Sequence, residues 1–94
     1  MTDWKEEIHY VCSEMEQFLL EKNEAYGNSI FEPVHIYCKA DTIEQINMRI
    51  DDKLSRLIRG KEYPGDDTMK DLAGYYLLKR AYEKAKEVNN GVKP

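Results

Sequence analysis

A run of basic and acidic residues in the middle of the chain is the clearest candidate for chemistry. Its charges recur at i, i+3, i+4 and i+7, which places them on one face of a helix: Arg49, Asp52, Lys53 and Arg56. They lie beside the apolar face expected of the same helix, formed by Ile43, Ile46, Ile50, Leu54 and Leu57. Charges along a partly buried seam are costly unless they are paired. Acids of a neighbouring helix or the phosphates of a ligand could pair with them, and a solvated face is the third alternative.

Carboxylates also recur at helical spacing. Glu21 and Glu24 lie one turn apart in one segment, and Asp67 and Asp71 lie one turn apart in another. Carboxylate pairs on facing helices can bind Mg²⁺ or Mn²⁺, because these hard cations prefer oxygen ligands. Such an ion would bridge the phosphates of a nucleotide and activate water. An acidic, solvated helix surface explains the same pattern without a metal.

A glycine and several tyrosines accompany these charges. Gly74 lies inside an expected helix, where glycine costs about 1 kcal/mol relative to alanine, so it marks a close helix crossing or room for a ligand. The chain contains seven tyrosines. Four of them could stack on a base through their rings: Tyr26, Tyr37, Tyr75 and Tyr76. Each one taken alone also fits a partly buried position in the core.

Composition limits the class of protein. The 94 residues make one small domain, residues 1–94, that buries only part of its surface and is therefore a candidate for self-association. Hydrophobic residues reach 41%, enough for a core, and the interspersed charges sum to −4, which weighs against a surface for duplex nucleic acid. The apolar runs are too short to span a membrane. The first residues lack the basic and apolar regions of a signal peptide, so we expect a cytoplasmic protein.

The apolar spacing predicts an all-α fold, a three-helix antiparallel unit. The first helix should cover residues 3–25. Its buried face should be formed by apolar residues spaced by three and four positions: Trp4, Ile8, Val11, Met15 and Phe18. Cys12 lies near this face and is interpreted as a small core residue.

Capping signals position the other two helices. Asp41 and Glu44 have the form of a capping box before a second helix at 42–59, and a third helix should cover 67–88. We expect residues 89–94 to form a frayed tail. The long connection at 26–40 carries several large apolar side chains, so we expect it to cover the core and line a pocket, or to pack against another subunit.

Three motifs together resemble a known group of proteins. They are Lys22-Asn23-Glu24-Ala25-Tyr26-Gly27-Asn28-Ser29, the stretch from Arg49 to Arg56, and Asp71-Leu72-Ala73-Gly74-Tyr75, with Pro33 between the first two. The chain resembles small phage and prophage proteins related to the nucleotide-modification-associated domain. That group is similar in turn to the MazG-like all-α nucleoside triphosphate pyrophosphatases. The resemblance covers about residues 15–82.

The resemblance assigns roles to the carboxylates. The pyrophosphatases use an ExxE pair on one helix and an ExxD pair on a later one, and Glu21 with Glu24 matches the first pair. Thr68 stands where the glutamate of the second pair is expected, which leaves Asp71 with Asp67 one residue too far upstream. This departure weighs against hydrolysis but is compatible with the expected nucleotide site.

Phosphate recognition would then depend on the basic residues Lys22, Arg49, Lys53 and Arg56. Tyr26, Asn28, Ser29 and Tyr75 complete the predicted ligand-binding set. Lys53 lies closest to the apolar seam, so it could instead pair structurally with Asp71 or Glu21.

Three functions follow from these observations. The first is capture of a phosphorylated nucleotide, such as an immune-signalling nucleotide, by a homo-oligomeric phage protein that needs no cofactor and no turnover. The second is a Mg²⁺-dependent nucleotide pyrophosphatase. The third is a non-catalytic helical interaction protein whose charges serve solubility and assembly.

Overall fold

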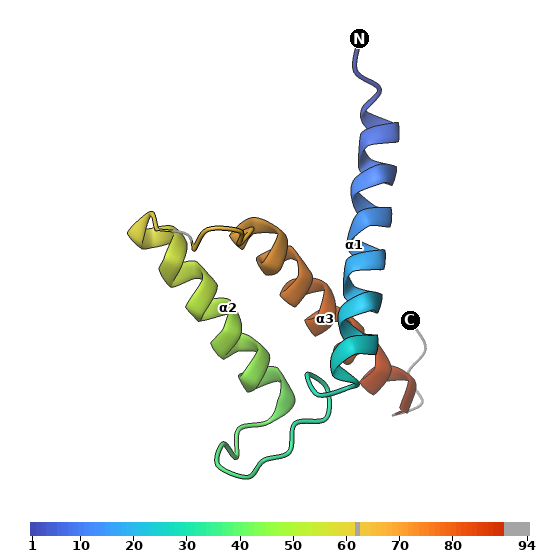
Figure 1. The fold of residues 1–94 in the computed structure, drawn as a ribbon. Coiled ribbons are helices and arrows are strands. Elements are labelled where there is room, and N and C mark those ends of the chain that lie inside the picture. Colours follow the sequence, from blue (N-terminus) through green and yellow to red (C-terminus); the bar gives the residue numbers. More distant parts are fainter. Residues whose placement is uncertain (62, 90–94) are drawn as a thin grey trace.

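A computed structural model describes residues 1–61 and 63–89 of the chain. It contains three helices, α1 (Trp4–Tyr26), α2 (Thr42–Arg59) and α3 (Thr68–Asn89), arranged as in Figure 1. No strand occurs in the described residues, and the prediction of an all-α fold is confirmed. The first and third helices begin and end one residue later than expected from the sequence. Glu62 of the expected turn and residues 90–94 of the expected tail lie outside the described residues.

Side-chain and glycine caps determine where the helices begin and end. The Asp3 carboxylate accepts a hydrogen bond from the Lys5 amide at 3.0 Å, and Asp41 accepts one from the Glu44 amide at 2.8 Å. The second of these bonds is the one that the capping-box pattern predicts. α2 ends at Gly60, whose φ of +66° lies in the left-handed region that glycine adopts without strain.

The core is small and lies mainly between α2 and α3. Ile46 and Ile50 of α2 and Leu72 of α3 are buried together, and Ile30 and Tyr75 pack against them. Figure 1 shows α2 and α3 side by side, running in opposite directions, while α1 crosses α3. No helix among the described residues has the length and apolar character needed to cross a membrane.

Gly74 allows α1 and α3 to approach closely. A Cβ atom at this position would lie 3.2 Å from Leu19 Cδ2, 3.7 Å from Phe18 Cε2 and 3.8 Å from Met15 Cε. These contacts support the close-crossing interpretation of this glycine. Met15, which packs here, is the one buried residue of α1.

The N-terminal half of α1 is not packed against the rest of the chain. Trp4, Ile8 and Val11 are 72%, 62% and 53% exposed. The prediction that they form one buried face with Met15 is therefore wrong for the single chain. Cys12 is also exposed, which corrects its interpretation as a core residue.

The reason is the position at which α3 begins. Lys70, in the first turn of α3, forms an ion pair with Glu14 at 3.6 Å, so the residues of α1 before Glu14 extend past the start of α3. Figure 1 shows this part of α1 projecting from the rest of the molecule. Helical spacing identified an apolar face correctly, but spacing carries no information about whether another element lies alongside it.

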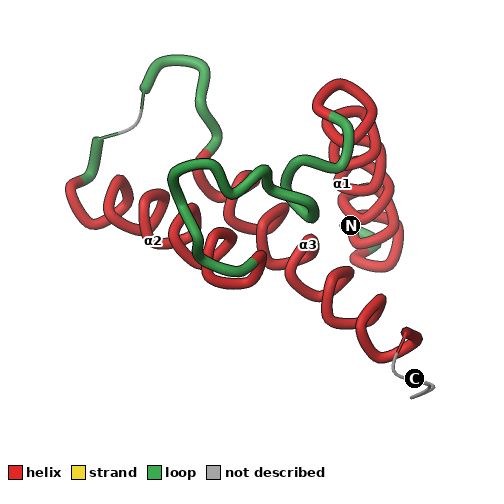
Figure 2. The backbone as a smooth tube through the Cα atoms, turned by 90° about the horizontal axis from the view of Figure 1, so that it is seen from below, coloured by secondary structure: helices red, strands yellow, loops and turns green. Residues whose placement is uncertain are grey.

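The long connection runs beneath the helices from the end of α1 to the start of α2 (Figure 2). Its first half is held in place, because Ile30 packs on the core and the Phe31 carbonyl accepts a hydrogen bond from the Thr42 hydroxyl at 3.1 Å. Its second half is open, with Ile36 and Tyr37 68% and 96% exposed. The expectation that the connection covers the core therefore applies to its first half.

Candidate ligand-binding site

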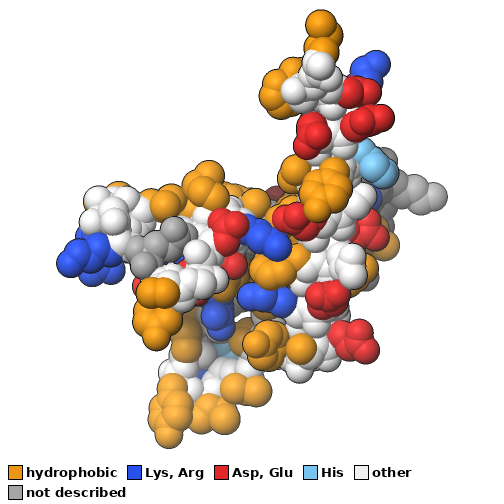
Figure 3. Space-filling model, turned by 45° about the horizontal axis from the view of Figure 1, so that its top comes forward, with side chains coloured by type: hydrophobic (Ala, Val, Ile, Leu, Met, Phe, Trp, Pro, Cys, Tyr) orange, Lys and Arg blue, Asp and Glu red, His pale blue; other side chains and the backbone are white. Residues whose placement is uncertain are grey.

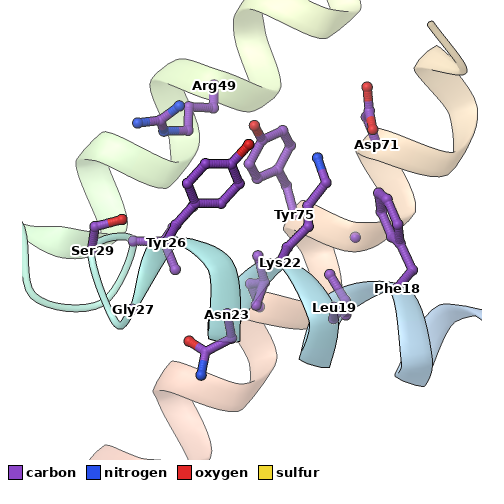
Figure 4. A pocket seen from close by; sticks show the side chains of 13 residues that line it. Phe18, Leu19, Lys22, Asn23, Tyr26, Gly27, Ser29, Arg49, Asp71 and Tyr75 are labelled. Carbon is purple, nitrogen blue, oxygen red and sulfur yellow. The ribbon is translucent and has the colours of Figure 1, made fainter. Parts of the chain in front are cut away.

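A cavity of about 360 Å³ lies where α1, the start of the connection, α2 and α3 meet (Figure 4). Five residues of the predicted ligand-binding set line it: Lys22, Tyr26, Ser29, Arg49 and Tyr75. Asp71, from the predicted metal-binding set, lines it as well. The structure thus brings together residues from all three motifs that the sequence singled out.

Three helices position these side chains. Lys22 and Tyr26 lie one turn apart on α1, Arg49 faces the cavity from α2, and Tyr75 reaches it from α3 (Figure 4). Gly27, with a φ of +62°, ends α1 and turns the chain so that Ser29 reaches the cavity wall. The local sequence Tyr-Gly-Asn-Ser therefore forms the turn at the end of α1 that borders the cavity.

Two cations of the cavity have no acidic partner in the part of the chain that the structure describes. Neither Lys22 nor Arg49 forms an ion pair with any residue that the structure describes. The Lys22 ammonium instead lies 4.8 Å from the centroid of the Phe18 ring, a cation–π contact that leaves its positive charge uncompensated. The cavity can therefore accept an anion at both positions without first breaking an ion pair.

The one carboxylate of the cavity is neutralised. Asp71 forms an ion pair with Lys53 at 3.0 Å, and the two side chains are 19% and 14% exposed. This is the structural pairing that the sequence offered as an alternative for Lys53. Because this ion pair neutralises Asp71, Asp71 adds little net negative charge to the cavity. Lys53 itself does not line the cavity.

Arg56 also lies outside the cavity. Its guanidinium bonds to Asp66 at 3.0 Å and to Asp52 at 3.4 Å. The charged stripe of α2 is thus divided, since Lys53 and Arg56 pair with acids of the chain and Arg49 faces the cavity. Spacing alone could not make this division, because it depends on where Asp66 and Asp71 lie in the fold.

The four carboxylates proposed to hold a metal do not come together in the single chain. Glu21 accepts a hydrogen bond from Gln17 at 3.1 Å on the exposed side of α1, and Glu24 is exposed too. Asp67 caps α3 by accepting a hydrogen bond from the Lys70 amide at 3.0 Å. Within the described part of the chain, no group of three or more His, Cys, Asp or Glu residues could hold a metal ion. The metal site stays a prediction.

Asn28 lies apart from the rest of the predicted set. It lines a different hollow, formed with Phe31, Glu32 and Tyr82 among others. Its carbonyl accepts hydrogen bonds from the amides of Phe31 and Glu32 at 2.9 and 2.8 Å, so its role in the single chain is to shape the connection.

Part of the cavity wall is formed by residues that the sequence patterns did not indicate. Phe18 was assigned only to the core, and Asn23, Leu19, Ile30 and Leu78 were not proposed as ligand-binding residues, yet all line the cavity. Asn23 Oδ1 is buried and has no hydrogen-bond partner in the described residues. A signal was available for Asn23, because it belongs to the first of the three motifs.

No family model, curated protein or solved structure matches this chain.

Proposed function

We propose that the chain binds a phosphorylated nucleotide in the cavity and retains it without turnover. One observation carries this proposal: the cavity places two cations that pair with no acid of the described residues, Lys22 and Arg49, beside two tyrosines, Tyr26 and Tyr75. Phosphate oxygens accept charge-assisted hydrogen bonds from such cations. A base has flat faces that stack on aromatic rings.

The volume and the lining residues of the cavity fit a ligand whose phosphates meet the cations and whose base meets the tyrosine rings. Its volume of about 360 Å³ lies at the lower end of the range for small-molecule sites, roughly 300–1,000 Å³. The guanidinium of Arg49 suits the bidentate recognition of phosphate. Leu19, Ile30 and Leu78 supply an apolar wall, and the Ser29 hydroxyl supplies a hydrogen-bonding group for a sugar or a base.

Retention without turnover is favoured by the state of the carboxylates. Asp71 is paired with Lys53, and Thr68 occupies the position expected for the glutamate of the second, ExxD, pair in the pyrophosphatase pattern. The described part of the chain holds no group of three or more carboxylate, histidine or cysteine side chains that could bind a metal ion. We therefore derive no step through a metal, and the proposed capture requires no cofactor.

A Mg²⁺-dependent pyrophosphatase is the second candidate, since Asp71 does line the cavity. Replacing both Glu21 and Asp71 with neutral residues, as in Glu21→Gln with Asp71→Asn, distinguishes the two functions. A pyrophosphatase loses turnover in this variant. A capture protein keeps its affinity for the nucleotide or binds it more tightly, because negative charge near the phosphates is removed.

The resemblance to phage and prophage proteins supports a more specific setting. We propose that the protein acts in the host cytoplasm, where capture would withdraw a signalling nucleotide from an antiphage response. We also propose that it is a homo-oligomer. Many large apolar side chains are exposed in the single chain, among them Trp4, Ile8, Tyr37 and Ile58.

Native mass spectrometry of the protein purified from cells tests the proposal. We expect an oligomer that carries a nucleotide, which is released unchanged on denaturation. Titration calorimetry with a panel of nucleoside mono-, di- and triphosphates and cyclic dinucleotides then ranks the ligands. Release of pyrophosphate in the presence of Mg²⁺ would establish the second candidate. Absence of binding to the whole panel, with no ligand retained from cells, would leave the interaction protein.

A further inference from the structure

The part of α1 before Glu14, which we call its free half, presents an apolar stripe that no described residue of the chain covers. Trp4, Ile8 and Val11 recur at i, i+4 and i+7 and all face solvent. A row of exposed large apolar side chains is typical of a surface that packs against a partner. The stripe cannot turn back onto its own chain, because Met15 and Gly74 hold the continuous helix against α3.

The charges of α1 argue against pairing with a second α1. This helix carries six glutamates against two lysines; Glu6 and Glu7 lie in the free half beside Lys5, and Glu14 at its end is paired with Lys70. Two such helices placed side by side would bring acids of one copy against acids of the other. The surface that receives this helix should therefore be apolar at its centre and basic at its edge.

The same chain carries exposed side chains of both kinds at the end of α2 and the start of α3. Leu57, Ile58 and Met69 are 42%, 85% and 66% exposed there. Arg59 and Lys61 are exposed beside them and form no ion pair with any described residue. Figure 3 shows basic side chains at the outer end of α2 and acidic side chains along the projecting α1. We call Leu57, Ile58, Arg59, Lys61 and Met69 the receiving surface.

We propose that the free half of α1 docks on the receiving surface of a second copy of this chain. The exchange is reciprocal, so a two-fold dimer contains two identical contacts, each with an apolar centre and acids opposite bases. This inference rests on the self-association proposed above and adds the surfaces that carry it. A second copy is the occupant because one chain supplies both complementary surfaces, and no described residue covers either of them.

Two single substitutions test the contact from its two sides. Ile8→Glu places a charge in the stripe, and Ile58→Glu places one in the receiving surface. Each should raise the dimer dissociation constant by at least about tenfold, because a glutamate would be buried without a partner. Val88→Glu is the matched control, since Val88 is 59% exposed and lies at the opposite end of α3 from Met69. Analytical ultracentrifugation measures association, and circular dichroism confirms that the helices remain.

Mixing the two variants decides how the copies are joined. A mixed dimer of Ile8→Glu and Ile58→Glu chains keeps one of its two contacts free of both substitutions, so mixing should restore association. An α1–α1 contact predicts instead that Ile58→Glu behaves as the parent chain, and this result would overturn the inference. If Ile8→Glu leaves the dissociation constant of the dimer unchanged, the two proposed surfaces are wrong, although self-association itself stands. A parent chain that stays monomeric at micromolar concentration would overturn self-association itself.

Discussion

The ammonium of Lys53 lies 3.0 Å from the carboxylate of Asp71, and this ion pair joins α2 to α3 beside the cavity. Both side chains are mostly withdrawn from solvent, so each charge depends on the other for compensation. The pair removes one cation and one anion from the set available to a ligand. The net positive character of the cavity is thus due to Lys22 and Arg49.

Breaking this ion pair should destabilise the fold. Lys53→Met leaves the Asp71 carboxylate partly buried without its partner, and we expect a loss of about 1–3 kcal/mol in the free energy of unfolding. Lys53→Met combined with Asp71→Leu should lose less than the two single variants added together, because the two positions interact directly. Urea denaturation followed by circular dichroism measures all three. If the stability lost in the double variant equals the sum of the losses in the two single variants, the ion pair contributes nothing to the free energy of unfolding.

Nucleotide affinity should depend on Arg49 rather than on Arg56. Arg49→Ala removes a charge-assisted contact worth about 1.5–3 kcal/mol, which corresponds to a loss of roughly tenfold to a hundredfold in affinity. Arg56→Ala is a matched control on the same helix, because Arg56 is already bonded to Asp66 and Asp52 outside the cavity. Titration calorimetry compares the two variants. Equal losses in both would contradict the assignment of the cavity as the phosphate site.

Lys22 and Arg49 are exposed, so salt should weaken nucleotide binding. Raising the ionic strength from about 0.05 to 0.5 M shortens the distance over which these charges act. The dissociation constant of the parent protein should rise over this range, and that of Arg49→Ala should rise less steeply. A dissociation constant independent of salt would indicate that the ligand is held by apolar and neutral contacts.

The sequence predicted most of the elements because local signals determine them. The Asp41 cap, the Gly60 terminus and the apolar positions of α2 act within a few residues, so their outcome does not depend on the rest of the fold. The same reasoning failed for the free half of α1. Trp4 and Ile8 have the spacing of a buried face, but whether another element covers them depends on where α3 begins, and both residues are exposed.

The candidate site could be predicted only in part for the same reason. Lys22, Tyr26, Arg49 and Tyr75 were chosen from three separate motifs, and the fold brings them to one cavity. The choice among the cations of the α2 stripe required tertiary contacts, since the acid that neutralises Lys53 lies on α3. Side-chain type and spacing thus select candidates, and the arrangement of helices decides which charges remain available.

Stacking by Tyr26 can be separated from hydrogen bonding by its hydroxyl. Tyr26→Phe keeps the ring and should retain most of the affinity, whereas Tyr26→Ala should lose about 1–3 kcal/mol if a base stacks on the ring. Tyr26 is 71% exposed, so neither substitution should change the fold. Calorimetry gives the affinities, and thermal denaturation checks stability. An equal loss in both variants would assign the contact to the hydroxyl instead.

Filling the space at Gly74 should disturb the fold and the cavity together. Gly74→Val adds atoms where a Cβ alone would already lie 3.2 Å from Leu19 and 3.7 Å from Phe18, and both of these residues line the cavity. We expect a loss of about 1–3 kcal/mol in stability from overpacking, with weaker nucleotide binding because α1 must move away from α3. Ala73→Val is the matched control, since Ala73 is exposed on the same helix and meets only the propensity cost of a β-branched residue. Urea denaturation and calorimetry measure the two effects. If Gly74→Val lost no more stability than the control, the close crossing of α1 and α3 at this glycine would be refuted.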